Sequence, residues 1–227
     1  MISQNKTRQF IELLLNWFGK NKRDYPWRRT KDPYRILIAE MMLQRTKADQ
    51  VVPTFEKFLE KYPDPRALAD APVEQIRKQI WTLGLEKRAP AFKRLACELV
   101  EKFGGRVPSD RKQLLDLYWV GNYIANAIMC HAYGQGVPTV DANFARILKR
   151  VFSIQAKEPA QKDARIWQFA ENLMPFVSKR PSEFNLAILD FGADVCSKKP
   201  RCTICPLNRI CDYYNSLLSG EKRRHAE

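Results

Sequence analysis

The chain has 227 residues, with 39 Lys and Arg against 25 Asp and Glu, a formal net charge of +14 and a pI near 9.6. A chain of this length can bury a proper core, as one domain or as two small ones. Its positive charge is spread along the chain and predicts a polyanionic partner. Nucleic acid is favoured over a membrane because the sequence has no long apolar run. The alternative is a soluble basic protein without such a partner.

The cellular compartment is indicated by the N-terminus and the cysteines. The N-terminus is polar and lacks a signal-peptide pattern. Four of the six cysteines crowd near the C-terminus, which suits a reducing cytosol and a metal site better than a disulfide framework. We therefore expect a cytoplasmic, nucleoid-associated protein.

The pattern of apolar residues predicts an all-α fold, because they recur at spacings of three and four and strand-like alternation is absent. The first helix is predicted at residues 8–18, with a buried stripe of Phe10, Leu13, Leu14, Trp17 and Phe18. A polar connector at residues 21–33 follows. Further helices are predicted at residues 34–43, 47–61, 73–83, 89–103, 110–117, 123–131 and 144–151.

Glu40 lies in the middle of an apolar run, so its side chain is expected to be buried. A buried carboxylate costs several kcal/mol unless it is paired or protonated. Glu40 is therefore either a structural partner for an arginine or a functional group.

A tight corner is predicted between the helices at 110–117 and 123–131. Gly121 can supply the positive φ that such a corner needs. The helix that follows would point free backbone N–H groups outward, which suits a phosphate. Downstream, Asp141 precedes the helix at 144–151 and could act as its N-cap, worth about 1 kcal/mol.

The cysteines form a motif, C-x5-C-x2-C-x5-C, made of Cys196, Cys202, Cys205 and Cys211. Four thiolates this close in sequence can enclose one metal centre, either an iron–sulfur cluster or zinc.

These features resemble the helix-hairpin-helix DNA glycosylase superfamily, which includes endonuclease III, and within it the adenine and G:T/G:U mismatch branch. The hairpin departs from the family, since Tyr118 and Trp119 stand where the family has Pro and Gly. The first cysteine gap is five residues instead of the usual six. The resemblance is carried by Pro26-Trp27-Arg28, Asp32-Pro33-Tyr34, Glu40, Gln44-Arg45, Val120-Gly121, Val140-Asp141, Asn185-Leu186, Asp190-Phe191-Gly192 and the cysteine loop.

The resemblance implies a two-part α-helical fold. Residues 27–134 would form a six-helix barrel that carries the hairpin. Residues 1–26 and 135–227 would form an iron–sulfur domain, in which the four cysteines hold a 4Fe–4S cluster.

The resemblance also implies catalytic roles. Asp141 would stabilise positive charge on the deoxyribose, and Glu40 would orient water or protonate the departing base. Tyr123 would line the pocket. It stands where strand-nicking members carry a nucleophilic lysine, so a monofunctional enzyme is expected. Its plain alternative is a packed helix residue.

Contacts to DNA are implied at two places. Gln44 and Arg45 would fill the space left by a flipped base, and Leu85 would wedge into the stack. Val120, Gly121 and Asn122 would hold a phosphate. The plain alternatives are that Arg45 is a surface cation and Leu85 a core residue.

The implied function is a monomeric DNA repair glycosylase that flips a mispaired base out of double-stranded DNA and hydrolyses its N-glycosidic bond. Uracil or thymine opposite guanine is favoured, because residues 141–144 read Asp-Ala-Asn-Phe where adenine glycosylases tend to have Asp-Gly-Asn-Val. Two alternatives remain: an adenine glycosylase acting opposite guanine or oxidised guanine, and a catalytically inactive DNA-binding iron–sulfur module.

Overall fold

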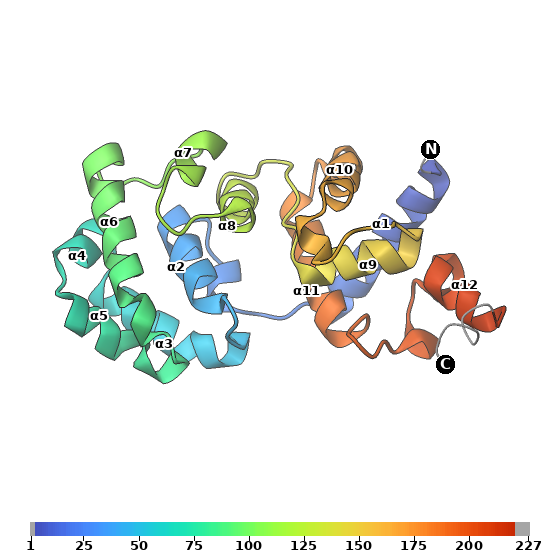
Figure 1. Ribbon diagram of the computed structural model, residues 1–227, viewed down its shortest axis with the longest axis horizontal. Coiled ribbons are helices and arrows are strands. Elements are labelled where there is room, and N and C mark those ends of the chain that lie inside the picture. The colour runs from blue at the N-terminus through green and yellow to red at the C-terminus, as the bar shows by residue number, and fades with distance from the viewer. Residues whose placement is uncertain (1–2, 221–227) are drawn as a thin grey trace. The chain divides into compact units, whose positions relative to one another are not determined.

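The computed structural model describes residues 3–220, and every regular element in that range is a helix (Figure 1). The prediction of an all-α fold is therefore confirmed. By their internal contacts the residues divide into two compact units, one formed by residues 24–135 and the other by residues up to 23 together with those from 136 onward. No helix in the described range is long and apolar enough to span a bilayer.

The unit of residues 24–135 is built around α2, whose residues are almost all apolar and buried. Helices α3 and α8 pack on α2, while α6 lies against α4 and α5. Its elements are η1 (Pro26–Arg28), α2 (Pro33–Leu43), α3 (Ala48–Lys61), α4 (Pro65–Asp70), α5 (Val73–Ile80), η2 (Trp81–Leu83), η3 (Glu86–Arg88), α6 (Ala89–Phe103), α7 (Arg111–Leu115), α8 (Asn122–Ala127) and the π-helical η4 (Ile128–Ala132).

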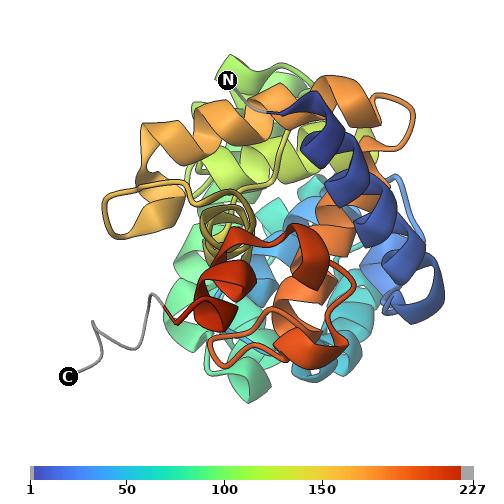
Figure 2. The same cartoon turned by 90° about the vertical axis from the view of Figure 1, so that its right-hand side faces the viewer.

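The second unit combines the N-terminal helix with the C-terminal part of the chain, and α1 packs along α11 (Figure 2). Helix α9 packs on α11 and also meets α12. The core contains edge-to-face aromatic pairs, among them Phe10 with Phe184 and Phe144 with Phe184. Its elements are α1 (Gln4–Asn21), α9 (Ala142–Phe152), η5 (Ala160–Lys162), α10 (Ala164–Leu173), η6 (Met174–Val177), α11 (Pro181–Asp194), η7 (Cys202–Ile204), η8 (Asn208–Ile210) and α12 (Asp212–Leu218).

Local sequence explains where many of these helices begin. Aspartate side chains cap α2, α4, α7, α9 and α10 by accepting hydrogen bonds from first-turn N–H groups. Pro33 and Pro65 follow two of these caps, at a position where the missing N–H is no loss. Helix α6 ends at Gly104, whose φ of 63° is left-handed.

Several predicted boundaries differ from the structure. The first helix begins at Gln4 instead of residue 8, because Ser3 accepts a hydrogen bond from the N–H of Lys6 and draws polar residues into the first turn. The helix predicted at 123–131 begins at Asn122 and changes to π-helical pairing after Ala127. Helix α4 was not predicted, since six residues are too few to show a helical period.

Candidate functional site

The corner between α7 and α8 turns differently from the prediction. Trp119, not Gly121, has the left-handed backbone, with φ of 69°. Gly121 is extended, with φ of −96° and ψ of −180°, and takes the N-cap position of α8. The expectation that Gly121 supplies the positive φ is therefore wrong, because the chain reverses two residues earlier.

Gly121 is nevertheless open to an outside partner. It is exposed, and a Cβ atom built on it would meet nothing within 4 Å. Neither backbone strain nor packing in this structure requires glycine there. Val120 is buried and donates its N–H to Leu117 O at 3.2 Å, so the outward N–H groups of this corner belong to the start of α8. Asn122 accepts a hydrogen bond from Arg111 Nη2 at 2.7 Å through its Oδ1.

Glu40 and Tyr123 lie on two helices of the same unit that pack together, α2 and α8. Glu40 is only 9% exposed and Tyr123 is partly buried. The sequence had not singled out His131, which follows in η4. Burial, aided by the positive charge of Arg28, lowers the pKa of His131 to about 4, so its imidazole is neutral at neutral pH.

The other three residues of this unit that were predicted to contact DNA differ from one another in exposure. Gln44 is partly buried just after α2, and Arg45 is exposed with φ of 66°. Leu85 is only 5% exposed, which favours the core alternative for this residue. Its role as a wedge stays a prediction.

In the other unit, Asp141 caps α9 and lies partly buried at its start. Its Oδ1 accepts the N–H of Phe144 at 2.7 Å, and its Oδ2 accepts the Asn143 side-chain amide at 3.0 Å. Burial raises the pKa of Asp141, and the N–H groups of Phe144 and Asn143 and the charge of Arg146 oppose that rise. Hydrogen bonds to both oxygens thus fix the orientation of the carboxylate, which is partly shielded from water.

A chain of hydrogen bonds links Asp141 to the cysteine loop. Arg146 Nη2 donates to Asn143 Oδ1 at 2.7 Å and to Gly192 O at 2.8 Å. Arg146 Nε donates to Cys196 O at 2.8 Å. A Cβ on Gly192 would lie 2.5 Å from Asn143 Cβ, so the approach of α11 to α9 needs glycine here. Sequence reasoning missed Arg146, because two of its three partners, Gly192 O and Cys196 O, lie 46 and 50 positions away along the chain.

The segment that leads to Asp141 is also anchored. Asn185, fully buried on α11, accepts the N–H of Thr139 at 3.0 Å and donates to Val137 O at 2.9 Å. A side-chain amide can serve one carbonyl and one N–H of an extended segment together. Asn185 therefore fixes Val137 and Thr139, in the segment that leads to Asp141.

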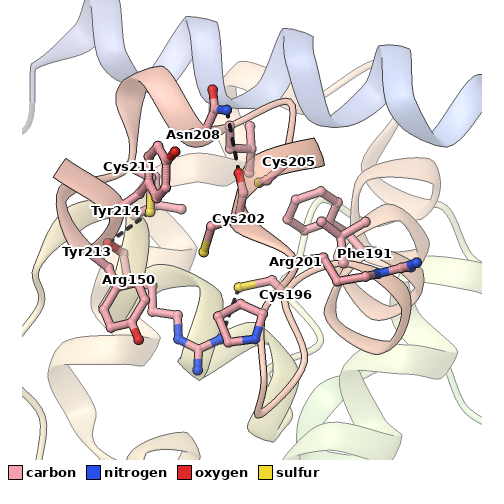
Figure 3. Close-up of a pocket in the computed structure, with 14 residues that line it drawn as sticks. Arg150, Phe191, Cys196, Arg201, Cys202, Cys205, Asn208, Cys211, Tyr213 and Tyr214 are labelled. Atoms are coloured by element: carbon pink, nitrogen blue, oxygen red, sulfur yellow. Dashed lines mark hydrogen bonds between the residues drawn. The ribbon is translucent and has the colours of Figure 1, made fainter. Parts of the chain in front are cut away.

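The four clustered cysteines line one pocket, together with Arg150 and aromatic residues of α11 and α12 (Figure 3). Arg150 Nη1 donates to Cys196 Sγ at 3.4 Å and to Ser197 O at 2.6 Å. Arg150 Nη2 donates to Lys198 O at 3.1 Å. Within residues 3–220 no three His, Cys, Asp or Glu side chains are placed to hold one metal ion.

Without a bound cation, burial in this pocket favours neutral thiols over thiolates. Burial raises the pKa of Cys205 to about 12, and that of Cys202 and Cys211 also rises. Backbone N–H groups of Leu207, Tyr213 and Tyr214 point at two of these sulfurs and favour the thiolate. Four neighbouring thiolates repel one another unless a bound cation compensates their charge. The residues present thus fit a metal or cluster that supplies that charge.

The predicted residues therefore fall into two groups. Glu40, Tyr123, Gln44, Arg45, Leu85 and the hairpin belong to the unit of residues 24–135. Asp141 and the four cysteines belong to the other unit, where the Arg146 network joins them.

Comparison with known proteins identifies the family to which the chain belongs. A model of the HhH-GPD superfamily of base excision DNA repair proteins matches residues 38–172. The chain is 39% identical to the thymine/uracil-DNA glycosylase of Pyrobaculum aerophilum, over 91% of this chain and 92% of that protein. It is 40% identical to the thymine-DNA glycosylase of Aeropyrum pernix, over 89% and 93%. It is 35% identical to the adenine DNA glycosylase of Homo sapiens, over 87% of this chain but 38% of that protein.

Solved structures give the same result for the fold. A thermostable thymine-DNA glycosylase superposes with a TM-score of 0.89 at 38% identity, covering 95% of this chain and 100% of that one. Endonuclease III in a non-covalent DNA complex superposes with a TM-score of 0.81 at 23% identity, covering 96% and 100%. The chain therefore has the endonuclease III-like fold that the sequence predicted.

Proposed function

The chain belongs to the HhH-GPD superfamily of base excision DNA repair proteins, and from this premise we propose that it is a monofunctional DNA glycosylase. It would excise uracil or thymine opposite guanine from double-stranded DNA, acting as a monomer. Support for the substrate comes from the relatives that match over nine-tenths of their length, such as the thymine/uracil-DNA glycosylase of Pyrobaculum aerophilum.

Asp141 carries the most weight in this proposal. Cleavage of an N-glycosidic bond builds positive charge on the deoxyribose, and a nearby carboxylate stabilises that charge best where water is scarce. The carboxylate of Asp141 is partly buried, and each oxygen has a hydrogen-bond donor. Such donors orient the carboxylate and favour its ionised form, which the stabilisation of a sugar cation requires.

Glu40 and Tyr123 complete the proposed chemistry. Glu40 would orient the attacking water or give a proton to the departing base, a role that suits a carboxyl group in an apolar setting. Tyr123 would form part of the pocket wall. Its phenol is no substitute for a lysine amine, which could attack the sugar and form a Schiff base. Hydrolysis without strand cleavage follows from that difference.

DNA binding is proposed for the corner before α8 and for Gln44, Arg45 and Leu85. The open space at Gly121 supports close approach of a phosphate to the first N–H groups of α8. The net charge of +14 supports a polyanionic partner.

We also propose a 4Fe–4S cluster held by Cys196, Cys202, Cys205 and Cys211. Zinc needs all four sulfurs at about 2.3 Å from one ion, whereas a cluster spreads its thiolates over separate irons. Four cysteines that line one pocket, with Arg150 Nη1 donating to Cys196 Sγ, support a centre bound by four thiolates, and the family resemblance favours the cluster over zinc. When bound, it would hold the loop that presents Lys198, Lys199 and Arg201 to DNA phosphates. On this proposal, residues 27–134 are the barrel and residues 1–26 with 135–227 the iron–sulfur domain.

An adenine glycosylase is the second candidate, favoured by the match to the human enzyme. A single-turnover assay separates the two on labelled duplexes that carry G:U, G:T, A opposite oxidised guanine, or only normal pairs. We expect cleavage at G:U and G:T, visible only after alkali or heat. Asp141→Asn, which keeps the shape of the side chain, should lose about 10²–10³ in rate while still binding DNA.

Three results contradict the proposal. Preferential cleavage opposite oxidised guanine would transfer the assignment to the adenine branch. Strand breaks without alkali, together with a borohydride-trapped adduct, would exclude a monofunctional mechanism. No excision on any duplex by iron-loaded, folded protein would leave a DNA-binding module.

A further inference from the structure

Two residues with a strained backbone, Arg45 and Trp119, are linked to Gln44. Among residues 3–220 the non-glycine residues with positive φ are Arg45 at 66°, Trp119 at 69° and Ser153 at 52°. Arg45 directly follows Gln44, and the indole of Trp119 is hydrogen-bonded to the Gln44 side chain. A left-handed backbone is unfavourable for a bulky L-residue and persists only where the surroundings hold it.

The surroundings of Trp119 do hold it. The preceding residue, Tyr118, donates its N–H to Glu98 Oε2 at 2.9 Å, and its ring lies 4.0 Å from the Arg94 guanidinium. Arg94 and Lys102 both pair with Glu98, so the corner is tied to α6 at Tyr118. The next residue, Trp119, then projects outward and is 41% exposed.

Two donors meet at one atom of Gln44. Trp119 Nε1 lies 3.0 Å from Gln44 Oε1, and Arg88 Nη1 lies 3.4 Å from the same oxygen. Arg88 also donates to Met41 O at 3.3 Å, and its guanidinium lies 6.0 Å from the Trp119 ring centroid. Only the amide oxygen can accept from an indole and a guanidinium, so the orientation of the Gln44 amide is determined. No hydrogen bond within residues 3–220 uses its Nε2 group, which remains a donor.

We propose that Trp119 is a positioning residue that presents Gln44 Nε2 as a hydrogen-bond donor to the base opposite the flipped nucleotide. This inference rests on the proposed function and adds a rule for the opposite base. Guanine and thymine carry a carbonyl oxygen where adenine and cytosine carry an amino group. A fixed amide donor can bond to the carbonyl oxygen of guanine or thymine. Opposite adenine or cytosine it would face an amino group, which is also a donor. The enzyme thereby prefers guanine or thymine as the opposite base, and that preference depends on the indole N–H.

The test uses duplexes with a tetrahydrofuran abasic analogue opposite G, T, A or C, so that no bond has to be cleaved. Affinities of the iron-loaded protein are measured at one salt concentration, because phosphate contacts vary steeply with salt. Parent protein should favour G and T over A and C by about fivefold, the scale of one neutral hydrogen bond. Trp119→Phe keeps a ring but removes the N–H, and should bring that ratio close to one.

Two further variants separate positioning from a general loss of binding. Gln44→Ala should also abolish the preference, and Trp119→Phe added to Gln44→Ala should change it no further, because both act through one contact. Trp167→Phe is the matched control. It removes an indole hydrogen bond of 2.8 Å to Gln161 O in the other unit and should leave the ratio unchanged.

The outcomes are distinguishable. Full preference retained in Trp119→Phe, or no preference in the parent, overturns the role of Trp119 while excision of G:U still supports the glycosylase. A parent protein that neither excises G:U nor binds the abasic duplex more tightly than undamaged DNA overturns the proposed function, and this inference with it.

Discussion

At Asp141, burial and hydrogen bonding act in opposite directions on the same carboxyl group. Burial raises its pKa, whereas the N–H groups of Phe144 and Asn143 and the charge of Arg146 hold it down. The proposed role needs the ionised form. Because an acid is ionised above its pKa, the rate should fall as the pH is lowered through a pKa above the ordinary value for aspartate.

Asn143→Ala tests this balance. The Asn143 amide donates to Asp141 Oδ2 and stabilises the ionised form, so its removal should raise the pKa further. The acidic limb of the single-turnover rate should therefore move to higher pH, with a smaller change at alkaline pH. Asn172→Ala removes an exposed amide of the same unit and is the control. An acidic limb that does not move would show that Asn143 has no influence on the ionisation of Asp141.

The packing of α11 on α9 requires glycine at a single helix position. A Cβ on Gly192 would lie 2.5 Å from Asn143 Cβ, and Gly192 O also accepts from Arg146. Glycine inside a helix is normally worse than alanine by up to about 1 kcal/mol. At Gly192 the steric overlap reverses that preference.

Gly192→Ala should therefore destabilise the protein by about 1–3 kcal/mol, the usual range for overpacking. It should also slow excision, because Asn143 must move and Asp141 loses its amide donor. Gly19→Ala in α1 is the matched control: its Cβ would meet nothing within 4 Å, so this variant should be slightly stabilised. Urea denaturation of both variants measures the difference, and equal stabilities would contradict the close approach.

Substitution of Gly121, in the corner before α8, is expected to affect DNA binding more than stability. Its φ of −96° is accessible to any residue, and a Cβ there meets open space. Gly121→Val should lower stability by only about 0.5–1 kcal/mol, because the backbone is unstrained but valine is a poorer N-cap than glycine. DNA affinity at fixed salt should drop about tenfold or more, or about 1.4 kcal/mol, because the added methyl groups block a phosphate.

Gly121→Ala, with its smaller side chain, should fall between the parent and Gly121→Val. Unchanged affinity in both variants would mean that phosphate is held by the surrounding cations and not by the backbone of this corner.

At the scale of the molecule, the proposed cluster makes a prediction that needs no substrate. The purified protein should be yellow-brown and contain about four iron atoms per chain. Cys202→Ala should lose iron and be less stable, because the thiols of the pocket would no longer be joined through one group. Elemental analysis and the visible spectrum measure this. A colourless protein with one zinc per chain would contradict the cluster and leave four-cysteine zinc.

Local chemistry made much of this protein readable from its sequence. Apolar spacing placed α6 at residues 89–103 and α2 within one residue, since helical period depends on neighbours three and four positions away. Asp141 at the start of α9 was recognised as a helix cap for the same reason. The family followed from short motifs, among them the hairpin remnant, Val140-Asp141 and the cysteine spacing.

Only the tertiary structure decided which distant residues meet. The Trp119 indole reaches Gln44, 75 positions earlier, and Arg146 reaches Cys196, 50 positions later. The left-handed backbone fell on Trp119 instead of Gly121 because Tyr118 is hydrogen-bonded to Glu98 of α6 and the Trp119 indole to Gln44, which follows α2. Such contacts have no period and no local signature, since they depend on how helices pack and not on the residues beside them in the chain.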